Sequence, residues 1–270
     1  MIAGLALLTH SLRRTRVFMF AMVGLVAGVQ VLFVLAAESL QQFSAFERIA
    51  LLFPDFVRQL LGSSLITVMS FRGVACLGYF HVAIVAVLVG MAIAIATEPA
   101  VEVETRFLDF VLAHPVSRQW IVFRSMLLLM GCVAVVVTAM LLSTRAALHW
   151  LAAPEHSRAV FDVVPLLSLN LAAILICWGS IAMVPAALVH RRSVAVGIAG
   201  FLAAASYITD LVSQVWQPLR GVARLSPFHY YNALNLITGN ADPGRDLLVL
   251  ACIAGVCFIL ASLLFCRRDL

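Results

Sequence analysis

The sequence predicts an all-α integral membrane protein with six transmembrane helices. Of its 270 residues, 63% are hydrophobic and 11% are charged, whereas soluble domains carry about 25% charged residues. Six stretches contain no Asp, Glu, Arg or Lys, and they approach or exceed the roughly 20 residues that cross a bilayer. With their ends adjusted, the spans fall at about residues 17–37, 73–97, 122–144, 163–189, 193–214 and 247–266. No linker separates them, so residues 1–270 are expected to form a single transmembrane domain.

The arginines predict the orientation of the chain. All eighteen basic residues are arginine. With the N-terminus inside, ten of them fall in roughly 49 cytoplasmic residues and eight in roughly 90 external residues, and cytoplasmic connections are enriched in basic residues. Both termini are therefore expected in the cytoplasm. Since no soluble face presents this charge, the lipid bilayer is the expected partner and nucleic acid is not.

The first sixteen residues predict an interfacial helix ahead of the first span. One of its faces is apolar and arginines follow, which suits a helix lying in the cytoplasmic headgroup layer; a disordered tail is the alternative. In the first span, Gly24 and Gly28 have the GxxxG spacing that allows close helix packing. Gln30 in the same span is expected to form an interhelical hydrogen bond.

The external connections predict short interfacial helices. Residues 38–72 are too apolar for a free loop and should form two such helices, 43–53 and 54–61, separated at Pro54. Residues 225–239 should form another before the last span. The second span is expected to be one long helix, in which His81 is either a neutral core residue or, less favoured, a proton relay.

A cluster near residue 150 raises the question of a metal site. His149, Glu155, His156 and Asp162 lie within fourteen residues. The spacing of the histidines and the break at Pro154 fit no standard ligand pattern, so a solvated loop is favoured. The six cysteines lie in apolar runs without CxxC spacing and are interpreted as buried hydrophobic residues.

One long charged segment, residues 98–124, separates the second and third spans. Its polar residues have helical spacing and predict an amphipathic helix at the membrane surface. Pro99 should begin this helix and Pro115 should end it. Glu102 precedes Arg106 by four residues, the favoured order for an ion pair within a helix. The predicted polar stripe consists of Glu98, Glu102, Arg106 and Asp109.

Several kinds of chemistry are absent from the sequence. It contains no GxxxxGK[ST] phosphate loop, no HExxH and no GxSxG, so no catalytic, cofactor or metal site is predicted. Ion-coupled transporters need carboxylates or broken helices near the midplane, and neither feature is expected from this sequence. Uphill transport by this protein would therefore draw its energy from another subunit through a cytoplasmic contact.

Residues 104–118, ETRFLDFVLAHPVSR, resemble the segment that follows the second helix in type-2 ABC transporter permeases. The shared positions are Glu104, Leu108, Asp109, Ala113 and 115–118, with a basic residue six positions later. The chain departs from the family pattern at residues 106–107, where Gly-Thr is common. Residues 53–62 and 225–230 are similar to the family as well, and the likeness extends over nearly the whole chain.

The resemblance implies a permease subunit, most often an exporter, in a bacterial inner membrane. The subunit would pair with a second copy and rest on a cytoplasmic ATPase subunit, which binds ATP and Mg; the chain itself would not be an enzyme. The charged helix would be the coupling helix. Its implied ATPase-coupling residues are Glu102, Glu104, Arg106, Asp109, Pro115, Arg118 and Arg124. The implied dimer seam contains Gly24, Gly28, Gly197 and Gly200.

Two alternative functions remain open on the sequence. One is an ATP-independent secondary transporter or channel. The other is a polytopic membrane enzyme or assembly factor that uses the region of His149 and His156. The sequence does not identify the substrate, although a path lined by Leu, Val, Ala and Phe favours lipids, hydrophobic drugs or peptides over small ions.

Overall fold

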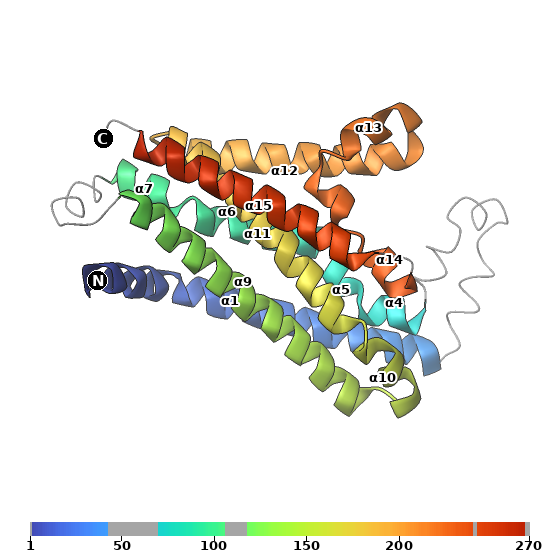
Figure 1. The fold of residues 1–270 in the computed structure, drawn as a ribbon. Helices are drawn as coiled ribbons and strands as arrows, with labels where there is room; N and C mark the ends of the chain where they lie inside the picture. Colours follow the sequence, from blue (N-terminus) through green and yellow to red (C-terminus); the bar gives the residue numbers. More distant parts are fainter. Residues whose placement is uncertain (1, 43–69, 106–117, 240–241, 268–270) are drawn as a thin grey trace.

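The computed structural model describes residues 2–42, 70–105, 118–239 and 242–267, and this part of the chain is all-α (Figure 1). Five of its helices are long and apolar enough to cross a membrane, or up to six if a bent pair counts as one span. The predicted all-α, multi-pass membrane architecture is therefore confirmed at this level. The five long helices are α1 (Ile2–Gln42), α9 (Arg118–Leu151), α11 (Val164–Leu188), α12 (Arg192–Val215) and α15 (Pro243–Cys266).

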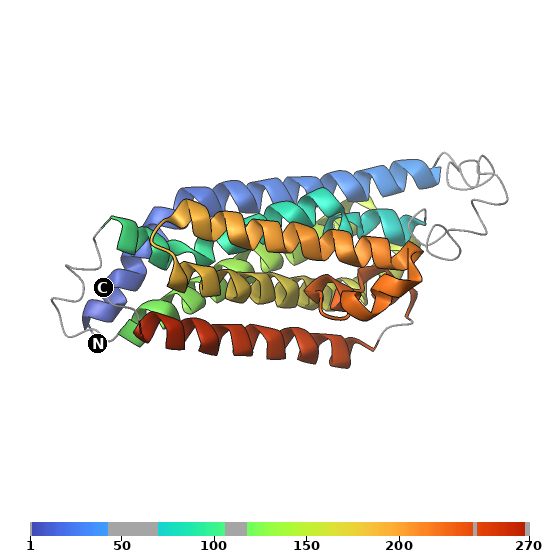
Figure 2. The ribbon, with the colours of Figure 1, turned by 90° about the horizontal axis from the view of Figure 1, so that it is seen from above.

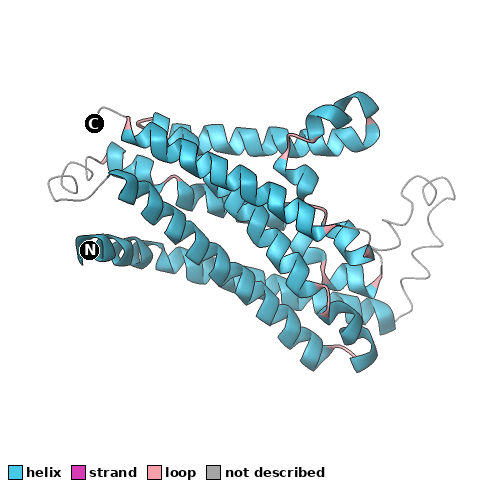
Figure 3. Cartoon of the chain, viewed as in Figure 1, coloured by secondary structure: helices cyan, strands magenta, loops and turns pink. Residues whose placement is uncertain are grey.

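Shorter elements connect the long helices, and Figure 3 shows helices and loops without a strand in the described residues. Before α9 they are α4 (Phe71–Ala75), α5 (Leu77–Phe80), α6 (Val82–Ala96) and α7 (Glu98–Glu104). After α9 they are α10 (Pro154–Phe161), η1 (Gln217–Leu219), α13 (Arg220–Ala223), η2 (Pro227–Tyr230) and α14 (Ala233–Thr238). The beginning of α1 and the end of α15 lie at the same end of the bundle as α7 (Figure 1).

The predicted interfacial helix and first span form one continuous helix, α1, of 41 residues. Figure 2 shows that the first turns of α1, in the darkest blue, run at an angle to the remainder. The stretch apolar enough to cross a membrane begins at Thr15, close to the predicted boundary. No helix-ending Gly or Pro lies between the two segments, which accounts for the absence of a break.

The prediction of one unbroken second span is wrong, because the chain leaves the helical conformation within it. His81 has φ −64° and ψ 124°, an extended conformation that separates α5 from α6. In an unbroken helix the Tyr79 carbonyl would accept a hydrogen bond from the amide four residues later. Here the Tyr231 hydroxyl donates to that carbonyl instead. A tertiary contact thus satisfies the backbone group that the break exposes.

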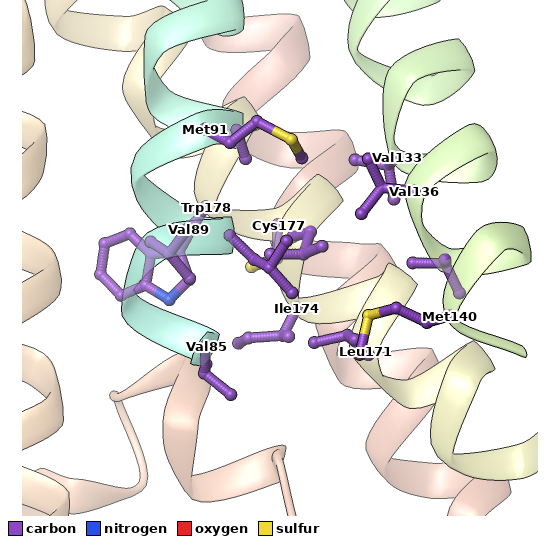
Figure 4. Packing of buried hydrophobic residues seen from close by; sticks show 14 of the residues in the cluster. Val85, Val89, Met91, Val133, Val136, Met140, Leu171, Ile174, Cys177 and Trp178 are labelled. Atoms are coloured by element: carbon purple, nitrogen blue, oxygen red, sulfur yellow. The ribbon is translucent and has the colours of Figure 1, made fainter. Parts of the chain in front are cut away.

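The hydrophobic core extends through the bundle, and Figure 4 shows the part of it where α6, α9 and α11 meet. Val89 on α6, Val136 on α9 and Trp178 on α11 are nearly inaccessible to solvent. A Cβ added at Gly179 of α11 would collide with the buried Leu129 side chain of α9. Glycine therefore allows these two helices to approach closely. On its other faces α11 contacts α12 and α15.

Polar side chains inside the bundle are few. Tyr79 and Thr144 share a buried hydrogen bond of 3.2 Å between their hydroxyl groups. Gln30 is fully buried, and neither atom of its amide has a hydrogen-bond partner among the described residues. The predicted interhelical hydrogen bond of Gln30 is therefore wrong. Its amide lies against Gly78, where any side chain would collide with it.

The short external helices match the predictions in part. The two helices predicted in residues 43–61 lie outside the described residues. In place of one helix over residues 225–239, the chain forms the 3₁₀ turn η2 and then α14, which ends at Gly239 with φ 77°. A left-handed C-cap of this kind favours glycine. The loop predicted around residue 155 contains the short helix α10.

Candidate functional site

The candidate site is built around α7, which follows the second apolar segment. The axes of α6 and α7 differ by 43° across Thr97. The Thr97 N–H donates a backbone hydrogen bond to the Ile93 carbonyl. The Thr97 hydroxyl also donates to the carbonyls of Ile93 at 2.9 Å and Ala94 at 3.2 Å, so Thr97 closes the last turn of α6. Pro99 stands in the first turn of α7, where its missing N–H costs nothing. The chain therefore ends one helix and immediately begins another in a new direction.

A buried ion pair fixes α7 to α9. The Glu102 carboxylate accepts a hydrogen bond from the Arg124 guanidinium. Only 8% of the Glu102 side chain and 2% of the Arg124 side chain are exposed. Removing one member of such a pair leaves an uncompensated buried charge, which costs far more than losing an exposed pair. The two side chains therefore hold α7 in one position against the beginning of α9.

Small side chains bring α7 close to two further helices. Ala100 of α7, Ala186 of α11 and Ala195 of α12 form a separate buried cluster, with Val189 packed against it. Alanine at each position allows the three backbones to approach closely. The turn between α11 and α12 therefore rests directly on α7.

Glu104 caps the beginning of α12. Its Oε2 accepts a hydrogen bond of 3.0 Å from the backbone N–H of Arg192. Arg192 is the first residue of α12, and the first N–H groups of a helix have no partner within it. A carboxylate at this end also interacts favourably with the helix dipole. The Arg192 guanidinium in turn donates to the Ala94 carbonyl of α6 at 3.0 Å.

The structure brings three of the seven predicted coupling residues into this site. Glu102 and Arg124 form the buried pair, whereas Glu104 is exposed at the end of α7. The predicted helix continues to Glu104 in the described residues, where Glu102 pairs with Arg124. The predicted pair of Glu102 with Arg106 involves a residue outside the described part of the chain. Arg118 begins α9, but its side chain lies outside the described residues, as do Arg106, Asp109 and Pro115.

Arg192 was not predicted as a site residue. It lies directly before the fifth predicted span, 193–214. Its position in the sequence could have indicated a role, because it is the last charged residue before an apolar run. Such a residue can begin a helix and also reach a neighbouring helix with its long side chain. The partner atoms, Glu104 and the Ala94 carbonyl, lie 88 and 98 residues away in sequence, so spacing could not reveal them.

An apolar groove of about 380 Å³ runs between α6 and α12. Val85 and Val89 line one side, and Ala203 and Tyr207 line the other. Phe228 of η2 lies at the groove, with its ring 5.4 Å from the rings of both Tyr207 and Trp178. The groove presents hydrocarbon and aromatic surface, so it suits an apolar occupant.

The four glycines predicted at a dimer seam lie on α1 and α12. Gly24, Gly28 and Gly197 are exposed and Gly200 is half-buried. A Cβ built at any of the four would have no other heavy atom within 4 Å. The described residues of other elements therefore leave these four positions uncovered, and the seam remains a prediction.

The described residues contain no group of three or more His, Cys, Asp or Glu side chains that could hold a metal ion. His149 lies exposed in the last turn of α9, and the side chain of His156 lies outside the described residues. Comparisons with known protein families, with curated proteins and with solved structures found no match.

Proposed function

We propose that this chain is the membrane-spanning permease subunit of an ATP-driven ABC transporter, and that it works as an exporter. A separate nucleotide-binding subunit would bind ATP and Mg and hydrolyse the ATP, so the chain needs no catalytic residue of its own. The observation that carries the proposal is the attachment of α7 to three long helices. A helix held in this way is suited to receive force from a partner.

Each attachment gives α7 a path for transmitting a displacement. The ion pair of Glu102 and Arg124 connects it to α9. The alanine cluster connects it to α11 and α12, and Glu104 adds a hydrogen bond to the first residue of α12. Packed helices move as rigid elements when one of them is shifted. A push on α7 would therefore tilt several spans together.

The predicted coupling residues would take two different roles. Glu102 and Arg124 are buried and would fix the position of α7. Glu104 is exposed and would lie at the contact with the ATPase. Arg106, Asp109, Pro115 and Arg118 would complete that contact from the segment that follows.

The remaining features of the proposal concern the assembly. The subunit would form a homodimer in a bacterial inner membrane, with both termini and α7 in the cytoplasm. The open glycines of α1 and α12 would lie at the dimer seam, and the groove between α6 and α12 would face the transport path. Its apolar lining favours lipids, hydrophobic drugs or peptides as substrates.

Site-specific photocrosslinking tests the central contact. The crosslinking residue p-benzoylphenylalanine replaces Thr105, which is exposed just after α7, or Leu225, which is 82% exposed. Leu225 follows α13, which lies at the other end of the bundle from α7 in Figure 1. In native membranes, Thr105→p-benzoylphenylalanine should crosslink to a protein that contains a GxxxxGK[ST] loop and hydrolyses ATP. The Leu225 variant should not. Crosslinking of that ATPase from the Leu225 position alone would place the motor at the wrong end and refute the proposal.

A further inference from the structure

A polar hollow of about 420 Å³ lies at the opposite end of the bundle from α7. It is formed where the segment after α12 meets the beginning of α15. The residues that line it are Arg224, His229, Tyr230, Asn232, Arg245 and Asp246.

Hydrogen bonds hold the wall of this hollow in place. The Tyr230 hydroxyl donates to the Arg224 carbonyl at 2.9 Å. The Asn232 amide donates to the His229 carbonyl at 3.0 Å and to the Asp246 carboxylate at 3.2 Å. The turn η2 is therefore fastened to α15, and the hollow is part of the fold.

The hollow has an excess of positive charge that the described residues do not neutralise. The guanidinium groups of Arg224 and Arg245 are exposed, and neither has an ion pair or hydrogen bond with the described residues. Asp246 also lines the hollow and accepts a hydrogen bond from Asn232 but keeps its negative charge, so the lining carries two positive charges against one negative charge. His229 lies 3.4 Å from Asp210, on the side of α12. Two arginines therefore remain available to one anionic group.

The polar hollow and the apolar groove share the turn η2. Phe228 and Tyr231 line the groove between α6 and α12, whereas His229 and Tyr230 line the hollow. These four residues are consecutive, so the two cavities lie on either side of a single turn. A molecule with an anionic head and an apolar tail would match both surfaces at once.

The dimensions of the groove favour one hydrocarbon chain. Its lining on α6 extends from Val82 to Ile93. At a rise of 1.5 Å per residue, this stretch is about 17 Å long. Half of a hydrocarbon core of roughly 30 Å is about 15 Å. The groove is therefore about as long as one leaflet is thick, and the hollow lies across η2 from it.

We propose that the hollow and the groove together bind an anionic phospholipid. Arg224 and Arg245 would hold its phosphate, since guanidinium groups recognise phosphate through paired charge-assisted hydrogen bonds. One acyl chain would lie along the groove between α6 and α12. The site shares its groove with the proposed transport path, but binding there needs neither α7 nor an ATPase. Failure of the lipid site would therefore leave the proposed contact between α7 and the ATPase untouched.

Native mass spectrometry of the purified full-length chain in a neutral detergent tests this site. The probes are phosphatidylglycerol and phosphatidylcholine with the same acyl chains, together with glycerol phosphate, which has no tail. Phosphatidylglycerol should bind at least about tenfold more tightly than either of the others, as expected when both surfaces contribute to binding. Equal binding of the two lipids, or full competition by glycerol phosphate, would overturn the proposal.

Variants locate the binding on the protein. The double variant Arg224→Gln, Arg245→Gln should weaken phosphatidylglycerol binding at least about tenfold. Arg220→Gln removes a nearby exposed arginine outside the hollow and should leave binding unchanged. Ala204→Phe, which fills the groove without changing charge, should also weaken binding. Circular dichroism checks that each variant is folded. The site would be refuted if the double variant and Ala204→Phe both kept full phosphatidylglycerol binding. It would also be refuted if Ala204→Phe changed dimerisation but left phosphatidylglycerol binding unchanged.

Discussion

The carboxylate of Glu102 and the guanidinium of Arg124 meet in a buried contact between α7 and the beginning of α9. Removing the charge of one partner should destabilise the protein strongly, since an unpaired buried charge costs about 3–5 kcal/mol. Glu102→Gln should therefore lower the free energy of unfolding by an amount in this range. Thermal unfolding of the detergent-solubilised protein measures the change.

The double variant Glu102→Leu, Arg124→Leu provides the matched control for this pair. Replacing both charges by apolar groups avoids an unpaired charge and is often close to neutral. The double variant should thus be more stable than Glu102→Gln. Glu104→Gln, at an exposed position, should cost at most about 2 kcal/mol through loss of a helix cap. A double variant as unstable as Glu102→Gln would contradict this account of the pair.

Gly179 should not tolerate even a methyl group. Its Cβ would collide with Leu129, which is fully buried, and overpacking of a core costs about 1–3 kcal/mol. Gly179→Ala should therefore lower the unfolding temperature, and Leu129→Ala should partly rescue it by making room. A Cβ added at Gly131 of α9 would have no neighbouring heavy atom within 4 Å. Gly131→Ala should therefore be neutral or slightly stabilising. Equal effects of the two glycine variants would exclude close packing as the cause.

Tyr231 should stabilise the break at His81 through its hydroxyl group. Tyr231→Phe removes the hydrogen bond to the Tyr79 carbonyl and leaves a buried acceptor unpaired, at a cost of about 1–3 kcal/mol. Chemical denaturation at pH 7 measures this loss. Tyr207→Phe is the matched control, because no hydrogen bond from its hydroxyl to the described residues is seen.

The stabilisation that Tyr231 provides should depend on pH. Burial, with a smaller contribution from Tyr79, raises the pKa of Tyr231 above its ordinary value near 10. The folded protein therefore keeps this proton after the unfolded chain has released it. The stabilisation should be fully present below about pH 10 and should decline at higher pH. The difference in stability between wild type and Tyr231→Phe should shrink correspondingly; a constant difference to pH 12 would contradict the assignment.

The glycines of α1 should control association of the chain with a second copy. Gly24→Leu together with Gly28→Leu would place two branched side chains on an exposed surface where close packing is expected. The variant should shift the protein from dimer to monomer in light scattering coupled to size-exclusion chromatography. Gly255→Leu on α15, at another open position, should not. A dimer that survives the double substitution would rule out this seam.

The sequence predicted the long helices well and the break in the second apolar segment poorly. Long runs such as 163–189 exceed bilayer thickness on their own, and α11 begins and ends within one residue of that range. The segment around His81 is equally apolar, so hydropathy predicts continuity. What stabilises the break is Tyr231, which lies 152 residues from Tyr79 in the chain. No local pattern contains that information.

The candidate site shows the same limit. Helical spacing identified Glu102 as part of a polar stripe and assigned it Arg106 as partner. In the described residues Glu102 contacts Arg124, which lies 22 residues away on the next helix, because the change of direction after α6 turns Glu102 toward α9. Arg106 lies outside those residues. Position in the sequence identified the charged segment. Only the packing of α7 against its neighbours determined which charges face inward.

The interruptions on either side of α6 give this segment the geometry of a strut with a joint at each end. The extended residue His81 forms one joint, and the 43° bend at Thr97 forms the other. With 15 residues, the strut is about 22 Å long, so a rotation of 10° at one joint displaces the other by about 4 Å. Such a rotation requires no hydrogen bond within the strut to break. The displacement of side chains on α6 relative to α12 would be smallest near the fixed joint and would increase along the helix toward the other joint.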